Sequence, residues 1–157
     1  MKILIALDAS PHSDQALRFV SRMRWPAGSR VIVLSVLSPL MGAAAASASE
    51  MMGLAERVLA ERRTELEELV ATAERELGES GFATEGRVEL GDPRDVLLTV
   101  AESERADVIV VGSHGRTGLA KLMLGSVSSH VVTHASCSVL VVKHATTSHA
   151  TGRRPAS

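Results

Sequence analysis

The sequence is poor in the features that mark several classes of binding protein. Aromatic residues make up 2% of the chain, with no Tyr and a single Trp, so the stacking platforms of single-strand nucleic-acid binders are nearly absent. The formal net charge is -1, which provides no general attraction to nucleic acid or to anionic membranes. We therefore expect neither nucleic acid nor membrane as a partner.

Cysteine and long apolar segments are also scarce. Cys137 is the single cysteine, which leaves no internal disulfide and favours a reducing compartment. No run approaches the roughly 20 apolar residues that span a membrane, and the first residues, MKILIALDAS, do not have the long apolar core of a signal peptide. With 157 residues, 45% of them hydrophobic and 22% charged, a single-domain cytoplasmic protein is expected.

Short apolar runs alternate with longer amphipathic segments along the chain. Strands are predicted at residues 3–7, 31–37, 83–90, 108–111 and 138–142. Helices are predicted at 11–24, at 50–77, from 92 onward and at 126–134, after caps such as Ser10 and Asp92. This alternation indicates a parallel α/β sheet. We expect a domain of residues 1–144, a mobile loop at 38–49 and a disordered tail at 145–157.

Side-chain patterns predict which faces of these elements are buried. The run at 83–90 alternates and contains Gly86, which favours an edge of the sheet. The helix that opens at Asp92 has Val96, Leu97, Val100 and Ala101 on its inner face. In the first two helices the predicted inner faces are Ala16, Leu17, Val20 and Met23, and then Leu54, Val58, Leu66, Leu69, Val70, Ala73 and Leu77.

A glycine-rich loop follows the fourth predicted strand. Glycines stand at 112, 115, 118 and 125, and a helix start follows at Ser126. Ligands of open parallel sheets bind beyond the carboxyl ends of strands. Small residues let backbone N–H groups approach a phosphate, and a helix N-terminus favours negative charge. The loop is predicted to hold nucleotide phosphates, and a plain turn is the alternative interpretation.

Several side chains carry candidate chemistry. Asp8 ends the first strand, where its carboxylate suits a metal ion or a ribose hydroxyl, and a cap or turn residue is an equal interpretation. His114 lies in the glycine loop and either touches phosphate or stabilises the loop. His130 and His134 have the spacing of a metal pair, but without a further ligand they are interpreted as surface histidines. Cys137 is interpreted as a small packed thiol.

Known nucleotide and hydrolase signatures are missing from the sequence. It contains neither G-x-x-x-x-G-K-[ST] nor the dinucleotide fingerprint G-x-G-x-x-G. The acidic cluster of a receiver domain is also missing, since Asp8 stands alone at its strand end. No Ser/His/Asp order or carboxylate pair indicates hydrolytic catalysis, and we assign no catalytic residue.

The glycine spacing resembles that of a known family. Gly112-x-x-Gly115, nine residues and then Gly125-Ser126 resemble the G-2x-G-9x-G-[S/T] motif of the ATP-binding branch of the universal stress protein family. The segments LIALDASPHSDQAL, VIVLSVL and SCSVLVVK are similar to that family as well. The resemblance implies a single Rossmann-like, adenine nucleotide alpha hydrolase-like domain. Its sheet would have five parallel strands in the order 3-2-1-4-5, with helices on both faces.

The resemblance also implies ATP, with its Mg²⁺, as the ligand. Adenine is expected near the ends of the first two strands, and ribose and phosphates at the glycine loop and the next helix start. Asp8 is expected to meet ribose or the Mg²⁺ that the triphosphate carries, and Ala9 departs from the Gly of many family members. By position, the implied binding residues are Ala6, Leu7, Asp8, Val36, Gly112, Ser113, Gly115, Arg116, Gly125, Ser126, Val127 and Ser128.

The function implied is that of a stress-response regulator that acts through nucleotide-dependent conformation or partner binding. A slow ATPase is an alternative, in which Arg116 or Lys121 would neutralise charge, although no base is evident. A dimeric protein that does not bind nucleotide is another. A homodimer through the last strand, Ser138–Lys143, is expected, because an apolar edge strand is an aggregation risk unless it is covered. The downstream partner, the stress and the preference among ATP, AMP and cyclic nucleotides stay open.

Overall fold

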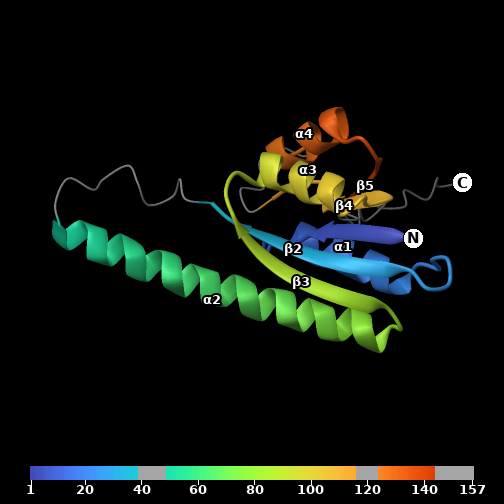
Figure 1. The fold of residues 1–157 in the computed structure, drawn as a ribbon, viewed down its shortest axis with the longest axis horizontal. Helices are drawn as coiled ribbons and strands as arrows, with labels where there is room; N and C mark the ends of the chain where they lie inside the picture. Colours follow the sequence, from blue (N-terminus) through green and yellow to red (C-terminus); the bar gives the residue numbers. More distant parts are fainter. Residues whose placement is uncertain (39–48, 116–123, 144–157) are drawn as a thin grey trace, which may run out of the picture.

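The computed structural model describes residues 1–38, 49–115 and 124–143. In these residues strands and helices alternate strictly, as the sequence predicts (Figure 1). The elements are β1 (Lys2–Ala6), α1 (Pro11–Arg22), β2 (Arg30–Leu37), α2 (Ser49–Glu79), β3 (Ala83–Leu90), α3 (Pro93–Ser103), β4 (Val108–Gly112), α4 (Ser126–His134) and β5 (Ser138–Val142).

The strands form one parallel sheet in the order β3-β2-β1-β4-β5, which confirms the predicted order. Ile3 of β1 lies opposite Val31 of β2 and Val108 of β4. The chain therefore leaves β1 on one side for β2 and later returns on the other side for β4. The carboxyl ends of β1 and β4 meet where the strand order reverses, which is where ligands of such sheets bind.

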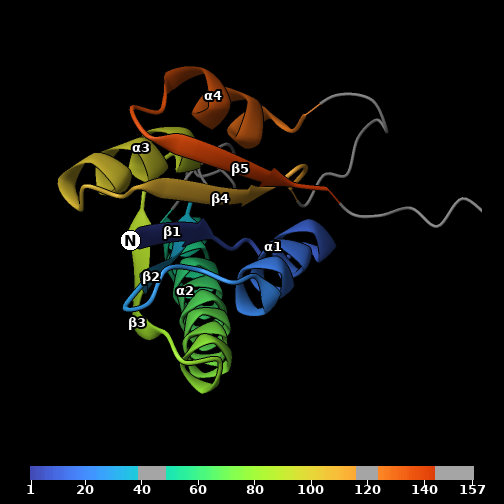
Figure 2. The same cartoon turned by 90° about the vertical axis from the view of Figure 1, so that its right-hand side faces the viewer.

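Helices cover both faces of the sheet, with α1 and α2 on one face and α3 and α4 on the other (Figures 1 and 2). Alternate side chains of β1 enter the two cores: Ile3 and Ile5 pack towards α1 and α2, and Leu4 packs towards α3 and α4. All three are fully buried. This two-sided burial explains why the strands read as continuous apolar runs.

β3 lies at the edge of the sheet, as its alternating pattern predicts. Gly86, near its middle, lets α2 approach closely, because a Cβ there would overlap Val70 and the carboxylate of Glu74. The predicted inner face of α3 is confirmed, since Leu97, Val100 and Ala101 are buried and Val96 packs against the same core.

Some predicted boundaries and faces are wrong. Met23 is 46% exposed because α1 ends at Arg22 and Met23 adopts an extended backbone. Val58 is 52% exposed, although Leu66, Val70, Ala73 and Leu77 farther along α2 are buried. Figure 1 gives the reason: the N-terminal part of α2 runs past the end of the sheet and has no strand beneath it.

Other expectations concern residues without a description. The predicted tail at 145–157 lies outside the described residues. Of the predicted loop at 38–49, only Ser38 and Ser49 are described, and Ser49 already belongs to α2. The Leu54 side chain also lies outside the described part of the structure. Among the described residues, the helices do not offer a segment apolar and long enough to span a bilayer.

Candidate functional site

The turn after β1 is built by short polar side chains. Ser10 caps α1, with its Oγ accepting a hydrogen bond from Ser13 N at 3.1 Å, and Pro11 occupies the first helical position. One carboxylate oxygen of Asp8, Oδ1, accepts a hydrogen bond from Ser10 N at 3.0 Å. Between them Ala9 adopts a φ of 63°, the left-handed region that glycine enters at little cost. Asp8 is therefore the turn residue, while Ser10 is the cap.

Two serines that the sequence reasoning did not single out support this turn. Ser35 is fully buried and its hydroxyl donates to Leu7 O at 2.8 Å. The Ser13 hydroxyl donates to Ser10 O at 2.9 Å and lies 3.4 Å from Asp8 N. The signal for Ser35 was a single polar residue inside the apolar run VIVLSVL, and for Ser13 it was the serine three residues after the cap.

The two ends of the glycine loop are joined through Ser113. Its carbonyl oxygen accepts hydrogen bonds from Gly125 N at 2.8 Å and from the Ser128 hydroxyl at 3.1 Å. Its own N–H donates to Val142 O at 2.9 Å. Ser113 and Ser128 are both 3% exposed. The start of α4 is thereby fixed beside the carboxyl end of β4.

The N-terminus of α4 differs from those of α1 and α3 in its capping. The N-cap Gly125 has no side-chain hydrogen bond to the first turn among the described residues, whereas α1 and α3 are capped by Ser10 and Asp92. The Ser128 hydroxyl bonds to carbonyl oxygens rather than to these amides. First-turn amides have no acceptor within their own helix. This arrangement can hold an anion through backbone N–H groups and the helix dipole.

The three motif glycines each allow a close approach. A Cβ at Gly115 would lie 3.0 Å from Asp8 Oδ2, the carboxylate oxygen not used in the turn. A Cβ at Gly125 would lie 3.2 Å from His114 Cα. A Cβ at Gly112 would lie 2.7 Å from the backbone carbon of His12. The fold thus brings Asp8 next to the glycine loop, as the sequence predicts.

Two histidines flank this loop. The rings of His12, at the start of α1, and His114 have centroids 5.1 Å apart. His114 Nδ1 lies 3.1 Å from the Ser113 hydroxyl. This contact fits the loop-stabilising interpretation of His114. His12 was not singled out in the sequence, where nothing marks it as a neighbour of the loop.

The remaining predicted binding residues are distributed over both faces of the sheet. Ala6 and Val36 are half-buried and pack towards α3 and α4, and Val127 packs against the same core. Leu7 is 3% exposed and packs on the opposite face, so its side chain points away from them. Ser126 is exposed at the start of α4. Arg116, and with it Lys121, lies outside the described residues.

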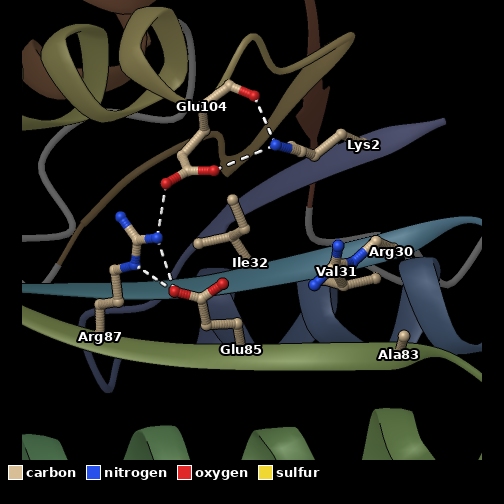
Figure 3. A pocket seen from close by; sticks show the side chains of 8 residues that line it. All are labelled: Lys2, Arg30, Val31, Ile32, Ala83, Glu85, Arg87 and Glu104. Atoms are coloured by element: carbon tan, nitrogen blue, oxygen red, sulfur yellow. Dashed lines mark hydrogen bonds and ion pairs between the residues drawn. The ribbon is translucent and has the colours of Figure 1, made fainter.

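A hollow of about 160 Å³ lies at the opposite end of the strands from the glycine loop (Figure 3). Glu104, at the end of α3, pairs with Lys2 of β1 at 3.0 Å and with Arg87 of β3 at 2.5 Å. Lys2 first and Arg87 second lower the pKa of the Glu104 carboxyl. The hydrogen bonds that Arg87 donates, first to Glu85 and second to Glu104, raise the pKa of its guanidinium group. These positive and negative side chains pair with one another. Their ion-pair network lines the hollow and joins the end of α3 to β1 and β3.

The described part of the chain shows neither a cluster of three metal ligands nor an activated thiol. It contains no group of three or more His, Cys, Asp or Glu side chains arranged to hold a metal ion. Cys137 is half-buried beside the core under α3 and α4, and burial raises the pKa of its thiol. This agrees with the packed thiol predicted from the sequence. The candidate site is therefore the group formed by Asp8, the glycine loop and the start of α4.

Comparison with known proteins decides the family. A sequence model described as the Universal stress protein family matches residues 1–143. The chain belongs to this family. It is 33% identical to the universal stress protein Sll1388 of Synechocystis, over 91% of this chain and 97% of that protein. It is 31% identical to the universal stress protein MJ0577 of Methanocaldococcus jannaschii, over 90% of this chain and 94% of that protein.

Solved structures of the family share the fold. The structure of MJ0577 matches with a TM-score of 0.82 at 28% identity, covering 92% of this chain and 96% of that one. A family protein from Arabidopsis thaliana with AMP bound matches with a TM-score of 0.63 at 22% identity, over 96% and 97%. A universal stress protein in complex with cAMP matches with a TM-score of 0.62 at 21% identity, over 91% and 96%.

Proposed function

We propose that this chain binds an adenine nucleotide, ATP with its Mg²⁺, and acts as a regulatory module in a stress response. The observation that carries the proposal is the N-terminus of α4, which has no capping side chain among the described residues and is separated from Asp8 by Gly115, at the point where the strand order reverses. An anion cradle and a carboxylate at one strand edge suit a ligand that has both phosphates and hydroxyls.

The phosphates would bind at the start of α4. The amides of its first turn and the small residues Gly115 and Gly125 leave room for backbone donors to reach phosphate oxygens. The exposed Ser126 adds a hydroxyl at the same place. Arg116, one residue beyond the described part of the loop, is proposed as a charged donor to the phosphates.

The ribose or the metal ion would meet Asp8. Its Oδ1 is held by Ser10 N, and its Oδ2 faces Gly115 across the loop. A carboxylate fixed in this way accepts hydrogen bonds from ribose hydroxyls, and it can equally ligate a Mg²⁺ that the phosphates bring. Because Asp8 belongs to no group of three or more potential metal ligands within the described residues, Mg²⁺ would depend on oxygens of the nucleotide.

The base would lie near the ends of β1 and β2. Ala6 and Val36 are half-buried on the face that also holds Val127, and small or branched apolar side chains suit the flat face of adenine. Leu7 would contribute through its backbone only, since its side chain is in the other core. The AMP and cAMP complexes of two structural relatives support an adenine nucleotide as the ligand class.

The first experiment is release and titration. Purified protein is denatured and its supernatant chromatographed for nucleotides, and ATP, AMP and cAMP are then titrated separately by calorimetry with and without Mg²⁺. ATP is expected to bind most tightly, because its additional phosphates offer more acceptors to the α4 amides. Absence of bound nucleotide together with no measurable affinity for any of the three would refute the proposal.

A substitution at Gly115 tests whether the glycine loop binds the nucleotide. Gly115→Val places branched carbon against Asp8 Oδ2 and fills the approach to the backbone, so affinity should fall roughly tenfold or more, about 1.4 kcal/mol. Gly78→Val is the matched control, since a Cβ there meets nothing within 4 Å. Phosphate release from ATP above a buffer control, lost in Asp8→Ala, would instead indicate a slow ATPase.

We also propose a homodimer through β5. This strand ends the sheet, and its apolar side chains Val139, Leu140 and Val141 are only half-buried. An uncovered apolar edge with free backbone groups favours pairing with another chain. Val141→Lys should halve the mass in solution while far-UV circular dichroism stays unchanged. A folded variant that keeps the dimer mass would exclude this interface, and so would a wild-type monomer.

A further inference from the structure

The second half of α4 carries two histidines that the nucleotide site does not use. His130 is half-buried and His134 is exposed at the last helical position. Their rings stack with centroids 4.1 Å apart and planes 24° apart. Residues four apart share one helix face, and His-x₃-His is a spacing that zinc sites use. The stack shows that both rings already lie together on that face.

A hydrogen bond fixes the tautomer of His134. Its Nδ1 lies 2.9 Å from the backbone oxygen of His130. A carbonyl oxygen can only accept, so Nδ1 carries the proton and the neutral ring presents a lone pair on Nε2. Metal-ligating histidines commonly donate their other N–H to a backbone carbonyl in this way, which orients the ring. His134 is thus prepared as a ligand through Nε2.

The electrostatics of this end of the helix favour a cation. The last carbonyl groups of α4 carry the negative end of the helix dipole. Asp92, at the start of α3, interacts electrostatically with His130, although both of its carboxylate oxygens are hydrogen-bonded to Arg94. Arg94 thus neutralises Asp92, so the attraction for a cation at this end of α4 comes from the helix dipole and not from Asp92.

We propose that His130 and His134 form a two-imidazole site for a divalent transition-metal ion, with Zn²⁺ as the reference ion. Imidazole suits Zn²⁺, Cu²⁺ and Ni²⁺, whereas Mg²⁺ prefers oxygen ligands. The described residues supply no third side-chain ligand, so water completes the coordination. This chemistry separates the site from the Mg²⁺ that a nucleotide would bring to Asp8.

The experiment uses the full chain without a tag, treated with chelator and titrated with ZnCl₂ alone. One equivalent of Zn²⁺ per chain should bind, and excess MgCl₂ should not displace it. His130→Gln and His134→Gln should each weaken binding roughly tenfold or more, because losing a ligand costs at least as much as losing an outer-sphere partner. Replacing His144 and His149 by Gln together is the matched control and should leave the affinity unchanged.

Two outcomes would overturn the proposal. One is Zn²⁺ affinity that survives in the His130→Gln/His134→Gln double variant. The other is affinity lost in the His144→Gln/His149→Gln control, which would place the ion in the tail. Thermal unfolding without metal shows whether each variant is folded. With Zn²⁺ added, the melting temperature should rise in the wild type and in the control but not in the double variant, because only a ligand bound to the native state stabilises it.

Discussion

Gly112→Ala isolates the packing role of the first motif glycine. Gly112 ends β4, where the strand passes over the start of α1. A Cβ there would lie 2.7 Å from His12 C, 2.8 Å from His12 O and 2.9 Å from His12 Cβ. Ordinary contacts begin at 3.4 Å, so β4 and α1 must separate by about 0.7 Å. Because the obstructing atoms are mostly backbone, a side-chain rotation cannot relieve the overlap.

The magnitude follows from two opposing effects. Inserting a carbon into a well-packed site typically costs about 1–3 kcal/mol. Replacing Gly by Ala restricts the unfolded chain and returns about 0.4–1 kcal/mol. We expect Gly112→Ala to lower the free energy of unfolding by about 1–2 kcal/mol. For a chain of this size, that lowers the melting temperature by roughly 2–8 °C.

Urea unfolding followed by circular dichroism measures this change. Gly78→Ala is the matched control, because Gly78 lies in α2 with nothing within 4 Å of an added Cβ. The control should be as stable as the wild type or up to about 1 kcal/mol more stable, since Ala is the better helix former. If Gly112→Ala behaved like the control, the close packing of β4 on α1 would be wrong.

Three further substitutions test the surroundings of the site. Ala9→Gly should raise the free energy of unfolding by about 1 kcal/mol, because glycine adopts the φ of 63° at this position without backbone strain. A lower melting temperature of the variant would contradict the presence of strain at Ala9. Asp92→Ala should cost about 1 kcal/mol at neutral pH through the lost helix cap. Arg94 holds the pKa of Asp92 at about 2, below its unfolded value, so the ionised carboxylate stabilises the fold above about pH 4. This contribution is lost as the pH falls towards 2, and the variant and wild type should then converge in urea titrations. Ser128→Ala should cost about 1 kcal/mol, since a buried hydroxyl no longer bonds to Ser113 O; unchanged thermal stability would show that the bond contributes little.

The sequence predicts the fold well because the three central strands, β1, β2 and β4, are buried on both faces. Continuous apolar runs such as Val31–Val33 have few alternatives to a parallel sheet, and the caps Ser10 and Asp92 mark helix starts by local chemistry. The errors fall where tertiary packing decides. Val58 continues the apolar pattern of α2 but is 52% exposed, and the N-terminal part of α2 runs past the end of the sheet.

The candidate site is predicted in part. Glycine spacing and the strand end locate Asp8 and the loop, since both follow from local sequence. The contacts that support the site do not follow from local sequence, because they join segments far apart in the chain. Ser35 reaches Leu7 O across neighbouring strands, and His12 meets His114 from another element. A single sequence gives no distance between such residues.

The three motif glycines have different physical roles, so they differ in what their presence indicates about nucleotide binding. Gly112 is required by the packing of β4 on α1 and would be kept by a chain that binds nothing. Gly125 is also constrained, by the backbone of His114 at 3.2 Å. Gly115 instead faces Asp8 Oδ2, which would lie 3.0 Å from an added Cβ and is a side-chain oxygen that needs to shift by only a few tenths of an ångström. Gly115→Val should therefore cost less stability than Gly112→Ala while removing more nucleotide affinity. The opposite order would mean that the spacing records packing and not ligand binding.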